Sequence, residues 1–263
     1  TLVAHAFGSR FRQGDPGTGK IVYRTTLTGG RMPATLFELS PVHLPIRGEH
    51  ALFPVRRIYC VGRNYADHAR EMGHDPALEQ PFFFSKPADA AVALPVSVPY
   101  PSQTADLQHE VELVVALHDG GRNLDAARAR ACIYGYGVGL DLTRRDLQRA
   151  ARDKGQPWDM GKGFDFSAPV SALVPASTCG HPRSGRIELA VNGMLRQQGD
   201  LSDMILDVEA LLVRLSALVE LKAGDLLFTG TPAGVSALQP GDRIEASVAG
   251  VGRLDLMIGP SLE

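Results

Sequence analysis

The chain has 263 residues, of which 44% are hydrophobic and 21% are charged, a composition typical of a folded globular domain rather than a disordered segment. Its 27 basic and 29 acidic residues give a formal net charge of −2, which argues against a general affinity for nucleic acids or anionic membranes. No apolar stretch approaches the roughly 20 residues that a membrane-spanning helix needs, so we expect no membrane segment.

The cysteine, glycine and proline contents further restrict the class of protein to which the chain can belong. The three cysteines, Cys60, Cys132 and Cys179, are odd in number and far apart. This spacing predicts reduced thiols in a cytoplasmic protein, without a disulfide framework or a zinc site. The 28 glycines and 18 prolines favour many short strands and turns over a helical bundle.

Residues 1–31 differ from the rest of the chain in charge. They hold five basic residues against one acidic residue, Asp15, and show no sustained periodicity. Residues 14–20 come close to a phosphate-binding P-loop, but Ile21 stands where that motif requires Ser or Thr, and no apolar strand precedes it. We therefore reject the P-loop and interpret residues 1–31 as an extension that the fold does not need. The expected division is an N-terminal segment over 1–52 and a main domain over 53–263.

From residue 53 onward, short apolar runs bounded by turn residues predict a domain built mainly of strands. The expected strands span residues 55–61, 81–87, 109–117, 133–140, 187–192, 225–229, 242–248 and 252–258. The expected helices span 65–72, 124–132, 143–155 and 208–219. The third has the form of a capping box, with Thr143 as N-cap and Asp146 three residues later. Because helices intervene irregularly, we expect an α+β, mostly β fold rather than a regular βαβ array.

Two glutamates, Glu110 and Glu112, lie inside the apolar run 109–117, and Asp141 ends a second apolar run. Residues i and i+2 of a strand point to one face, so the two glutamates share a face and repel each other unless a cation or water intervenes. Three carboxylates without a cysteine suit a hard divalent ion such as Mg²⁺ or Mn²⁺. The alternative is an ordinary half-buried strand whose glutamates face solvent.

A second candidate lies on the helix expected over 65–72. His68 and Glu71 are three residues apart, so they share one face of that helix and can form a hydrogen bond. A carboxylate that orients an imidazole and raises its basicity produces a general base able to activate water. The alternative is a polar helix face that carries an incidental pair.

Three further groups have the chemistry to bind an anionic substrate. Arg145 and Gln148 lie on one face at the start of a helix, where a guanidinium can hold a carboxylate. Lys162, in a Gly-rich stretch, can hold an anionic oxygen. Residues 229–234 form a tight turn whose backbone N–H groups and Thr231 hydroxyl can face a ligand. A capped surface helix, a solvated lysine and a plain turn are the alternatives.

Taken together, these segments resemble the fumarylacetoacetate hydrolase family over residues 53–258. The matching motifs, in order, are Gly-Arg-Asn-Tyr at 62–65, the His68/Glu71 helix, Phe-Ser-Lys-Pro at 84–87, His-Glu-Val-Glu at 109–112, Asp-Leu-Thr-Arg-Arg-Asp at 141–146, Lys-Gly-Phe at 162–164, Val-Asn-Gly at 191–193 and Thr-Gly-Thr-Pro at 229–232. Each motif alone is weak, whereas their common order is specific. The stretches 53–65, 99–104 and 143–148 are most similar to the fumarylpyruvate hydrolases of gentisate breakdown.

The resemblance implies the family's mixed β-sheet roll, similar to a β-sandwich, with a short helical lid over the site. It also implies a homodimer and one Mg²⁺ or Mn²⁺ per subunit, held by Glu110, Glu112 and Asp141. The lid would carry His68 and Glu71, which with Lys162 are the expected catalytic residues. Arg145, Gln148 and Thr231 are the expected substrate-binding residues.

The implied activity is metal-dependent hydrolysis of the C–C bond of a 3-acylpyruvate, most specifically fumarylpyruvate to fumarate and pyruvate. The enzymatic alternatives are an acylpyruvase, a decarboxylase of oxaloacetate, and an isomerase or decarboxylase of a 2-hydroxydienedioate, since all use the same ion. His68 and Glu71 favour hydrolysis, because they supply a base for water. The alternative from another class is a non-catalytic binding module whose acidic residues are merely solvated.

Overall fold

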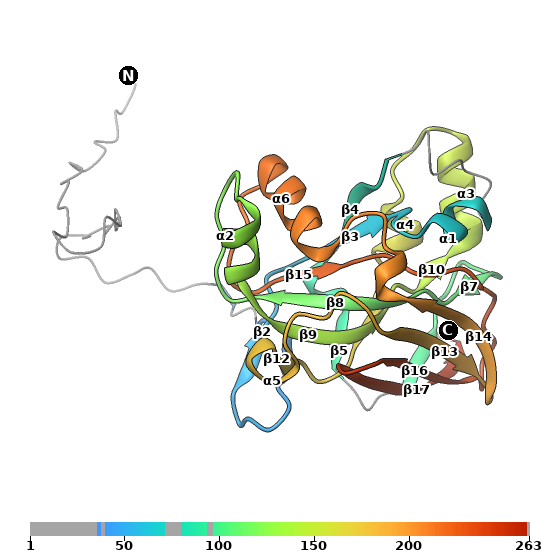
Figure 1. Ribbon diagram of the computed structural model, residues 1–263. Coiled ribbons are helices and arrows are strands. Elements are labelled where there is room, and N and C mark those ends of the chain that lie inside the picture. The colour runs from blue at the N-terminus through green and yellow to red at the C-terminus, as the bar shows by residue number, and fades with distance from the viewer. Residues whose placement is uncertain (1–35, 38–39, 72–79, 94–96, 262–263) are drawn as a thin grey trace, which may run out of the picture. The chain divides into compact units, whose positions relative to one another are not determined.

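The computed structural model describes residues 36–37, 40–71, 80–93 and 97–261 (Figure 1). The chain divides into two units, residues 1–40 and residues 41–263, and the described strands and helices all belong to the second unit. The P-loop-like segment at 14–20 and the rest of residues 1–31 lie outside the described residues. The dispensability of residues 1–31 and the boundary between residues 52 and 53 therefore stay predictions. In the described part of the chain, no helix is long and apolar enough to cross a membrane.

The larger of two main sheets is mixed and, within the described residues, has eight strands in the order β4-β3-β15-β8-β9-β11-β5, with β12 also paired to β9. Its strands are β3 (Arg57–Gly62), β4 (Phe82–Lys86), β5 (Ala91–Ala93), β8 (Val111–Leu117), β9 (Ile133–Leu140), β11 (Ala168–Val170), β12 (Val174–Pro175) and β15 (Asp225–Phe228). Strand β15 runs parallel to β3 and antiparallel to β8, so it joins the two halves of the sheet.

The second sheet, again counted over the described residues, has five strands in the order β14-β13-β16-β17-β6. These are β6 (Ser97–Tyr100), β13 (Arg186–Val191), β14 (Met194–Asp200), β16 (Arg243–Val248) and β17 (Gly252–Ser261). Two short antiparallel pairs complete the strands: β1 (His43–Pro45) with β2 (Leu52–Pro54), and β7 (Leu107–Gln108) with β10 (Thr143–Arg144).

Few helices accompany these sheets (Figure 1). The α-helices are α1 (Ala66–Glu71), α2 (Ala126–Ala131), α3 (Arg145–Asp153), α4 (Asp159–Lys162), α5 (Ala176–Cys179) and α6 (Val208–Leu218), and the 3₁₀ helices are η1 (Ala88–Ala90) and η2 (Leu201–Asp203). Helices α1, α3 and α4 lie near β3 and β4, whereas α2 packs on α6. The α+β, mostly β fold is confirmed, and every strand and helix expected from the sequence is present, with shifted ends except for the strand at 133–140.

Strand β8 explains how the sheets place the two glutamates. Its residues alternate between two apolar clusters, so both faces are covered and the strand reads as one apolar run. Val114 and Ala116 face the apolar cluster that contains no residue of the second sheet. Because side chains alternate along an extended chain, Glu110 and Glu112 are in phase with Val114 and Ala116. The residues that face the other cluster, between the sheets, are Val111, Leu113, Val115 and Leu117.

The predicted capping box is wrong. Helix α3 begins at Arg145, and the side chain of its N-cap residue, Arg144, makes no capping hydrogen bond. The Thr143 hydroxyl instead donates to the Asp141 carbonyl oxygen at 3.1 Å. The Asp146 carboxylate accepts a hydrogen bond from the Thr104 hydroxyl at 2.6 Å, 42 residues away in sequence. The side chains of Thr143 and Asp146 therefore form hydrogen bonds with other residues, and not with each other's backbone N–H groups as a capping box requires.

Gly139 of β9 stands opposite Glu112 of β8 and leaves no room for a side chain. A Cβ at this position would lie 2.5 Å from Val114 Cγ2 and 2.7 Å from Phe228 Cε1, both within the apolar cluster that contains no residue of the second sheet. The missing side chain therefore leaves room for Val114 and Phe228 to pack against β9 at the position opposite Glu112.

Gly139→Ala is expected to lower the free energy of unfolding by about 1–3 kcal/mol, because overpacking a buried site displaces its neighbours. The matched control is Gly137→Ala on the same strand, where the nearest atom to an added Cβ, Leu173 Cδ2, is 3.1 Å away. Denaturant unfolding of both variants is the measurement. Equal losses of stability in the two variants would contradict this role of Gly139.

Candidate active site

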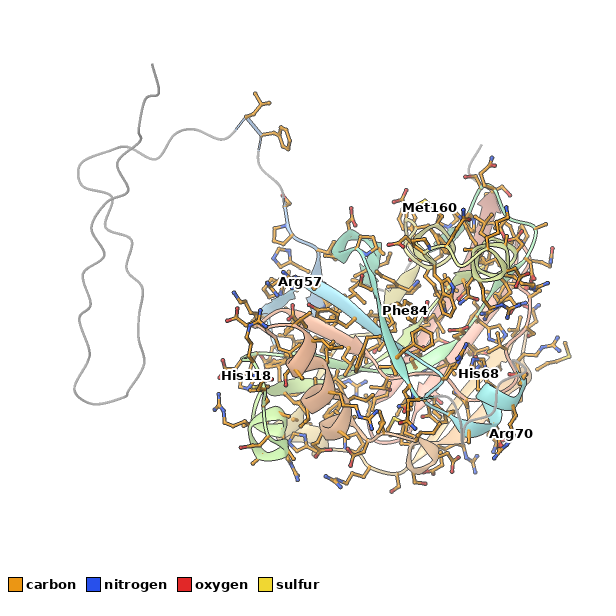
Figure 2. All side chains as sticks on the ribbon, turned by 90° about the horizontal axis from the view of Figure 1, so that it is seen from above. Arg57, His68, Arg70, Phe84, His118 and Met160 are labelled. Carbon is orange, nitrogen blue, oxygen red and sulfur yellow. The ribbon has the colours of Figure 1, made fainter. Side chains whose placement is uncertain are left out.

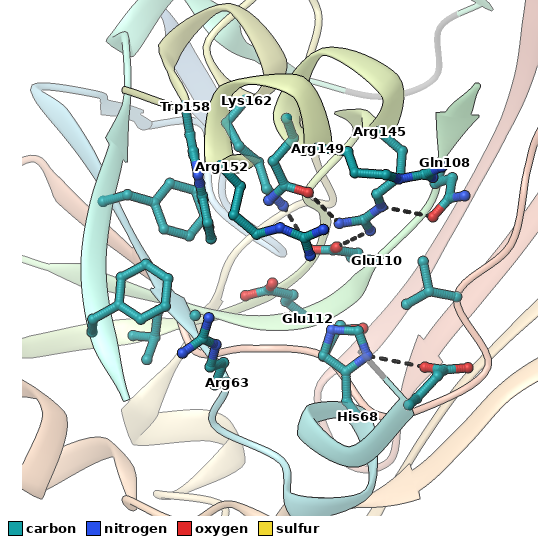
Figure 3. A pocket seen from close by; sticks show the side chains of 18 residues that line it. Arg63, His68, Gln108, Glu110, Glu112, Arg145, Arg149, Arg152, Trp158 and Lys162 are labelled. Atoms are coloured by element: carbon teal, nitrogen blue, oxygen red, sulfur yellow. Dashed lines mark hydrogen bonds and ion pairs between the residues drawn. The ribbon is translucent and has the colours of Figure 1, made fainter. Parts of the chain in front are cut away.

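A cavity of about 260 Å³ opens where α1, α3 and α4 meet the larger sheet (Figure 3). Its lining comes from β3, β4, these three helices and the segment that follows β15. Glu110 and Glu112 line it, and Figure 3 shows them in the middle, with α3 and Lys162 on one side and α1 on the other. Side chains far apart in sequence therefore meet in one enclosed space.

The centre of the site is a group of three buried carboxylates. Oxygen atoms of Glu110, Glu112 and Asp141 all lie within 4.8 Å of one another. The backbone ties two of them together, because the Asp141 N–H donates to the Glu110 carbonyl oxygen at 2.9 Å. Three negative charges this close in a buried site repel strongly, so positive groups must lie beside them.

Two buried lysines supply part of that positive charge. The Lys162 ammonium donates to Glu110 Oε2, Asp141 Oδ2 and Thr143 Oγ1, each at 2.8 Å. The Lys86 Nζ lies 2.8 Å from Asp141 Oδ1, which is an ion-pair distance. The geometry of that contact is nevertheless not that of a hydrogen bond, and Asp141 Oδ1 has no hydrogen-bond partner among the described residues. This oxygen is available as a ligand to a cation.

Arg145 completes the positive charge around Glu110. Its Nε donates to Gln108 Oε1 at 2.7 Å, its Nη1 donates to Gln148 Oε1 at 2.6 Å, and its Nη2 pairs with Glu110 Oε1. The guanidinium is almost fully buried. Arg145 and Gln148 therefore lie side by side on one face of α3, as their spacing predicted, and Arg145 also contacts Glu110.

The pKa values of the two glutamates shift in opposite directions. Burial would raise the pKa of Glu110, but the positive charges of Lys162 and Arg145 outweigh it and lower the pKa well below its usual range. Burial and the negative charges of Asp141 and Glu110 raise the pKa of Glu112. Lys162 keeps its proton, since Asp141 and Glu110 raise its pKa against the effect of burial.

The turn at residues 229–234 connects two parts of the site. The Gly230 N–H donates to Glu112 Oε2 at 2.6 Å, and the Gly234 N–H donates to Glu71 Oε1 at 3.0 Å. Between them, Thr231 lines the cavity, and its hydroxyl oxygen accepts a hydrogen bond from Gln197 at 2.8 Å. We expected these N–H groups to face a ligand, whereas they hold the protein's own carboxylates.

His68 and Glu71 form the hydrogen bond that their spacing predicted. His68 Nδ1 lies 3.1 Å from Glu71 Oε2, and the imidazole faces the cavity (Figure 3). The hydrogen bond from His68 lowers the pKa of Glu71, burial opposes it, and the Gly234 N–H lowers it further. A carboxylate acceptor favours the proton on Nδ1 and leaves Nε2 as the basic nitrogen.

The donor set of the carboxylate group fits a hard divalent ion. All three ligand groups are carboxylates, which Mg²⁺ and Mn²⁺ prefer. The Asp141 oxygen that lacks a hydrogen-bond partner within the described part of the chain, and the raised pKa of Glu112, both indicate negative charge that a cation would stabilise. The residues present therefore fit the ion.

Sequence reasoning missed several residues of the site. Lys86 was recognised only as part of a motif, although a lone lysine between an apolar strand and Pro87 is an available signal. Gln108 and Gln197 carry no such signal, because their partners lie 37 and 34 residues away. Three cavity-lining residues, Arg63, Arg152 and Trp158, were also not predicted.

Comparison with known proteins agrees with the fold. The model of the family described as "Fumarylacetoacetate (FAA) hydrolase C-terminal" matches residues 57–258. The crystal structure of a fumarylpyruvate hydrolase from Pseudomonas aeruginosa, in complex with Mn²⁺ and pyruvate, is 48% identical, with a TM-score of 0.85. That comparison covers 88% of this chain and 100% of the other.

Two curated relatives are oxaloacetate tautomerases, which differ in activity from the fumarylpyruvate hydrolase of P. aeruginosa. The oxaloacetate tautomerase YcgM of Escherichia coli is 42% identical over 199 residues, covering 75% of this chain and 90% of the relative. The mitochondrial oxaloacetate tautomerase FAHD1 of Rattus norvegicus is 42% identical over 196 residues, covering 74% and 88%.

The fold and the cavity define an enzyme built on a curled β-sheet framework. The family match covers more than half of the chain, and the chain belongs to the fumarylacetoacetate hydrolase family.

The raised pKa of Glu112 predicts how stability without an ion depends on pH. The contribution of this group to folding is fully present below 4.5, its ordinary pKa, and is lost as the pH rises through the higher folded-state pKa. In EDTA, the wild type is therefore expected to lose more stability than Glu112→Gln between pH 4.5 and neutral pH. Denaturant unfolding at a series of pH values is the measurement, and parallel curves would contradict it.

Excess Mn²⁺ is expected to stabilise the wild type but not Glu112→Gln, because the variant loses a ligand. An ion at 100 times its Kd adds about 2.7 kcal/mol to the free energy of unfolding. The control is Glu209→Gln, which removes a buried carboxylate that pairs with Arg183 outside the cavity. Equal stabilisation of wild type and Glu112→Gln would exclude Glu112 as a ligand.

Proposed function

We propose that this enzyme hydrolyses the C–C bond of a 3-acylpyruvate, with fumarylpyruvate as the substrate in gentisate catabolism and fumarate and pyruvate as products. The observation that carries the proposal is the position of the His68–Glu71 pair, which faces the same cavity as Glu110 and Glu112 of the carboxylate group (Figure 3). A base for water and a cation site then share one space. The structure of the P. aeruginosa fumarylpyruvate hydrolase with Mn²⁺ and pyruvate supports the choice of substrate.

Glu110, Glu112 and Asp141 would hold one Mg²⁺ or Mn²⁺ per subunit. When bound, the ion supplies a Lewis acid that stabilises negative charge on the pyruvate oxygens. Arg145 and Gln148 would bind the pyruvate carboxylate, and Thr231 would contact the substrate from the opposite wall. Lys162, whose ammonium already contacts two carboxylates, would offset charge on the reacting oxygen.

His68 would act as general base and then as general acid. Its Nε2 takes a proton from water as the water oxygen bonds to the acyl carbonyl carbon. The C–C bond to the pyruvate methylene then breaks, and its electron pair stays on that carbon. His68 returns the proton there, which yields pyruvate, while the acyl group leaves as a carboxylic acid and loses its proton to solvent. Glu71 orients the imidazole and stabilises its charged form throughout.

The second candidate is tautomerisation of oxaloacetate, favoured by the E. coli and rat relatives. The related decarboxylation of oxaloacetate and isomerisation of a 2-hydroxydienedioate would use the same carboxylates. In a tautomerase, His68 would move a proton between carbon and oxygen of one substrate without activating water. The candidates therefore differ in their products rather than in the residues they need.

A substrate panel separates the candidates. Fumarylpyruvate, acetylpyruvate and oxaloacetate are each incubated with Mg²⁺, Mn²⁺ or EDTA; cleavage products are identified by chromatography, and enol–keto exchange of oxaloacetate is followed by ultraviolet absorbance. Hydrolysis of fumarylpyruvate that EDTA abolishes is the expected result. Enol–keto exchange of oxaloacetate without C–C cleavage of any acylpyruvate would refute hydrolysis and leave the tautomerase.

His68→Ala is expected to lower kcat by about 10²–10⁴-fold, which is the usual effect of losing a general base. Binding of Mn²⁺, followed by calorimetry, should be unchanged because His68 is not a ligand. Asp67→Asn on the same helix is the control, since Asp67 pairs with exposed Arg70. A variant that keeps wild-type kcat would refute the assignment of the base.

Three further features belong to the proposal and stay predictions. The helix α1 that carries His68 is part of a lid over the cavity, the enzyme is a homodimer, and it acts in the cytoplasm. Residues 72–79, which include the expected last residue of this helix, lie outside the described part of the chain.

A further inference from the structure

The cavity has a second end that the proposed reaction leaves without a role. Arg63, which follows β3, and Arg152, on α3, both line it, together with three aromatic residues. Figure 3 shows Arg63 on the side of the cavity away from Arg145 and Gln108, and the Arg152 side chain extending into the cavity between Arg63 and Arg145. The pyruvate carboxylate is assigned to Arg145, so this end faces the acyl group of the substrate. The aromatic residues are Phe82, Phe84 and Trp158.

The three aromatic rings form a continuous wall. The Phe82 and Trp158 rings meet edge to face, with centroids 5.3 Å apart, and the Phe84 and Trp158 centroids are 6.1 Å apart. The Arg63 guanidinium lies over the Phe82 ring, with its carbon 5.3 Å from the centroid. An apolar wall of aromatic rings that ends at a guanidinium suits an unsaturated chain that ends in an anion.

The direction of Arg63 is fixed by its neighbour. Arg63 has a φ of 64°, in the left-handed region that residues other than glycine rarely adopt. Asn64 holds this turn, because its amide donates to the carbonyl oxygens of Thr229 at 2.8 Å and Leu206 at 3.0 Å and accepts from the Leu206 N–H at 2.9 Å. The strained backbone therefore places the Arg63 side chain at the cavity.

Arg145 has a buried acidic partner, whereas the ion pairs of Arg149 and Arg152 are exposed. Arg145 pairs with buried Glu110, and Arg149 donates to Asp106 at 3.1 Å. Arg152 contacts Asp153, at 3.1 Å, and that carboxylate is 62% exposed. Exposed pairs of this kind contribute little, so a bound anion can replace Asp153 as the partner of Arg152.

The two guanidinium groups are also close enough to repel each other. Burial lowers the pKa of Arg63, and the positive charge of Arg152 lowers it further. An anion that binds between Arg63 and Arg152 relieves this repulsion, and two guanidinium groups offer several N–H donors for a carboxylate.

We propose that Arg63 and Arg152 form a subsite for a second carboxylate, at the far end of the acyl group. The inference rests on the proposed function for the direction of the substrate, and it defines the substrate class as dicarboxylates with a planar acyl chain. The chain lies along Phe82, Phe84 and Trp158, and the terminal carboxylate binds the two arginines. Acylpyruvates with an uncharged acyl group use the same reacting atoms but lack this contact.

A binding experiment tests the subsite without any reaction. Trp158 is the only tryptophan in the chain, so its fluorescence reports on ligands at this end of the cavity. Fumarate is titrated against crotonate, which has a methyl group in place of one carboxylate, and EDTA prevents binding through a metal ion. We expect fumarate to bind about 10–100-fold more tightly, because hydrogen bonds to a charged group are lost in crotonate.

Arg152→Met and Arg63→Met are each expected to remove the preference for fumarate. Arg70→Met is the matched control, since Arg70 is 61% exposed, pairs with Asp67 and lies at the rim of the domain (Figure 2). Arg152 is 41% exposed at a helix end, so its variant should fold even if Arg63→Met does not. Equal affinities of fumarate and crotonate in the wild type, or a preference that survives in Arg152→Met, would overturn the subsite.

Kinetics then separate this inference from the proposed function. Arg152→Met should lower kcat/KM for fumarylpyruvate about 10–100-fold, mainly through KM, and leave acetylpyruvate unaffected. A parallel fall for both substrates would contradict the subsite while the hydrolase function stands. If the wild type cleaves no acylpyruvate but fumarate binding depends on both arginines, the function fails and the subsite stands.

Discussion

Three buried carboxylates within 4.8 Å of one another are the constraint on which the rest of the site depends. Without compensation, such a group would be protonated or would destabilise the fold. The protein answers with Lys86, Lys162 and Arg145, which are buried themselves and reach the carboxylates from β4, α4 and α3. The placement of β4, α4 and α3 around the carboxylates therefore brings basic side chains to the negative charge that needs to be balanced. Negative charge remains for a cation at Glu112, whose Oε2 accepts a hydrogen bond from a backbone N–H.

The turn after β15 makes the cation site and the acid–base pair one unit. Gly230 holds Glu112, and Gly234, farther along the same turn, holds Glu71. Gln197, which is fully buried on β14 of the second sheet, donates to the Thr231 hydroxyl and to the Pro232 carbonyl oxygen, each at 2.8 Å. The second sheet therefore contributes to the site without lining it. Through Gln197 it fixes the turn after β15, and the N–H groups of this turn hold Glu112 and Glu71.

The elements that could be predicted from the sequence are those whose signal is local. Strand β8 was predictable because its apolar run is continuous, and the pairing of His68 with Glu71 followed from helical spacing. Strand β14 was missed because most of its side chains are exposed or half-buried, so no apolar pattern marks it, although its Gln197 is fully buried. The capping box at Thr143 failed for a related reason, because Lys162 and Asp141 use the hydroxyl. Contacts between distant segments carry most of this site, and spacing along the chain does not encode them.

The three carboxylates, His68 and Lys162 do not by themselves determine which of the candidate reactions is catalysed, because each of these reactions would use the same groups. Removing a proton from water or from carbon needs one base, and both reactions place negative charge on the same oxygens beside Lys162 and the cation. Selectivity must then come from groups that touch only part of the substrate, because such contacts differ between an acylpyruvate and oxaloacetate. In this cavity the groups proposed for that role are Arg63, Arg152 and the aromatic wall of Phe82, Phe84 and Trp158. The proposed distinction between a hydrolase of long dicarboxylates and a tautomerase of oxaloacetate therefore lies at the acyl end of the cavity, not at the carboxylates.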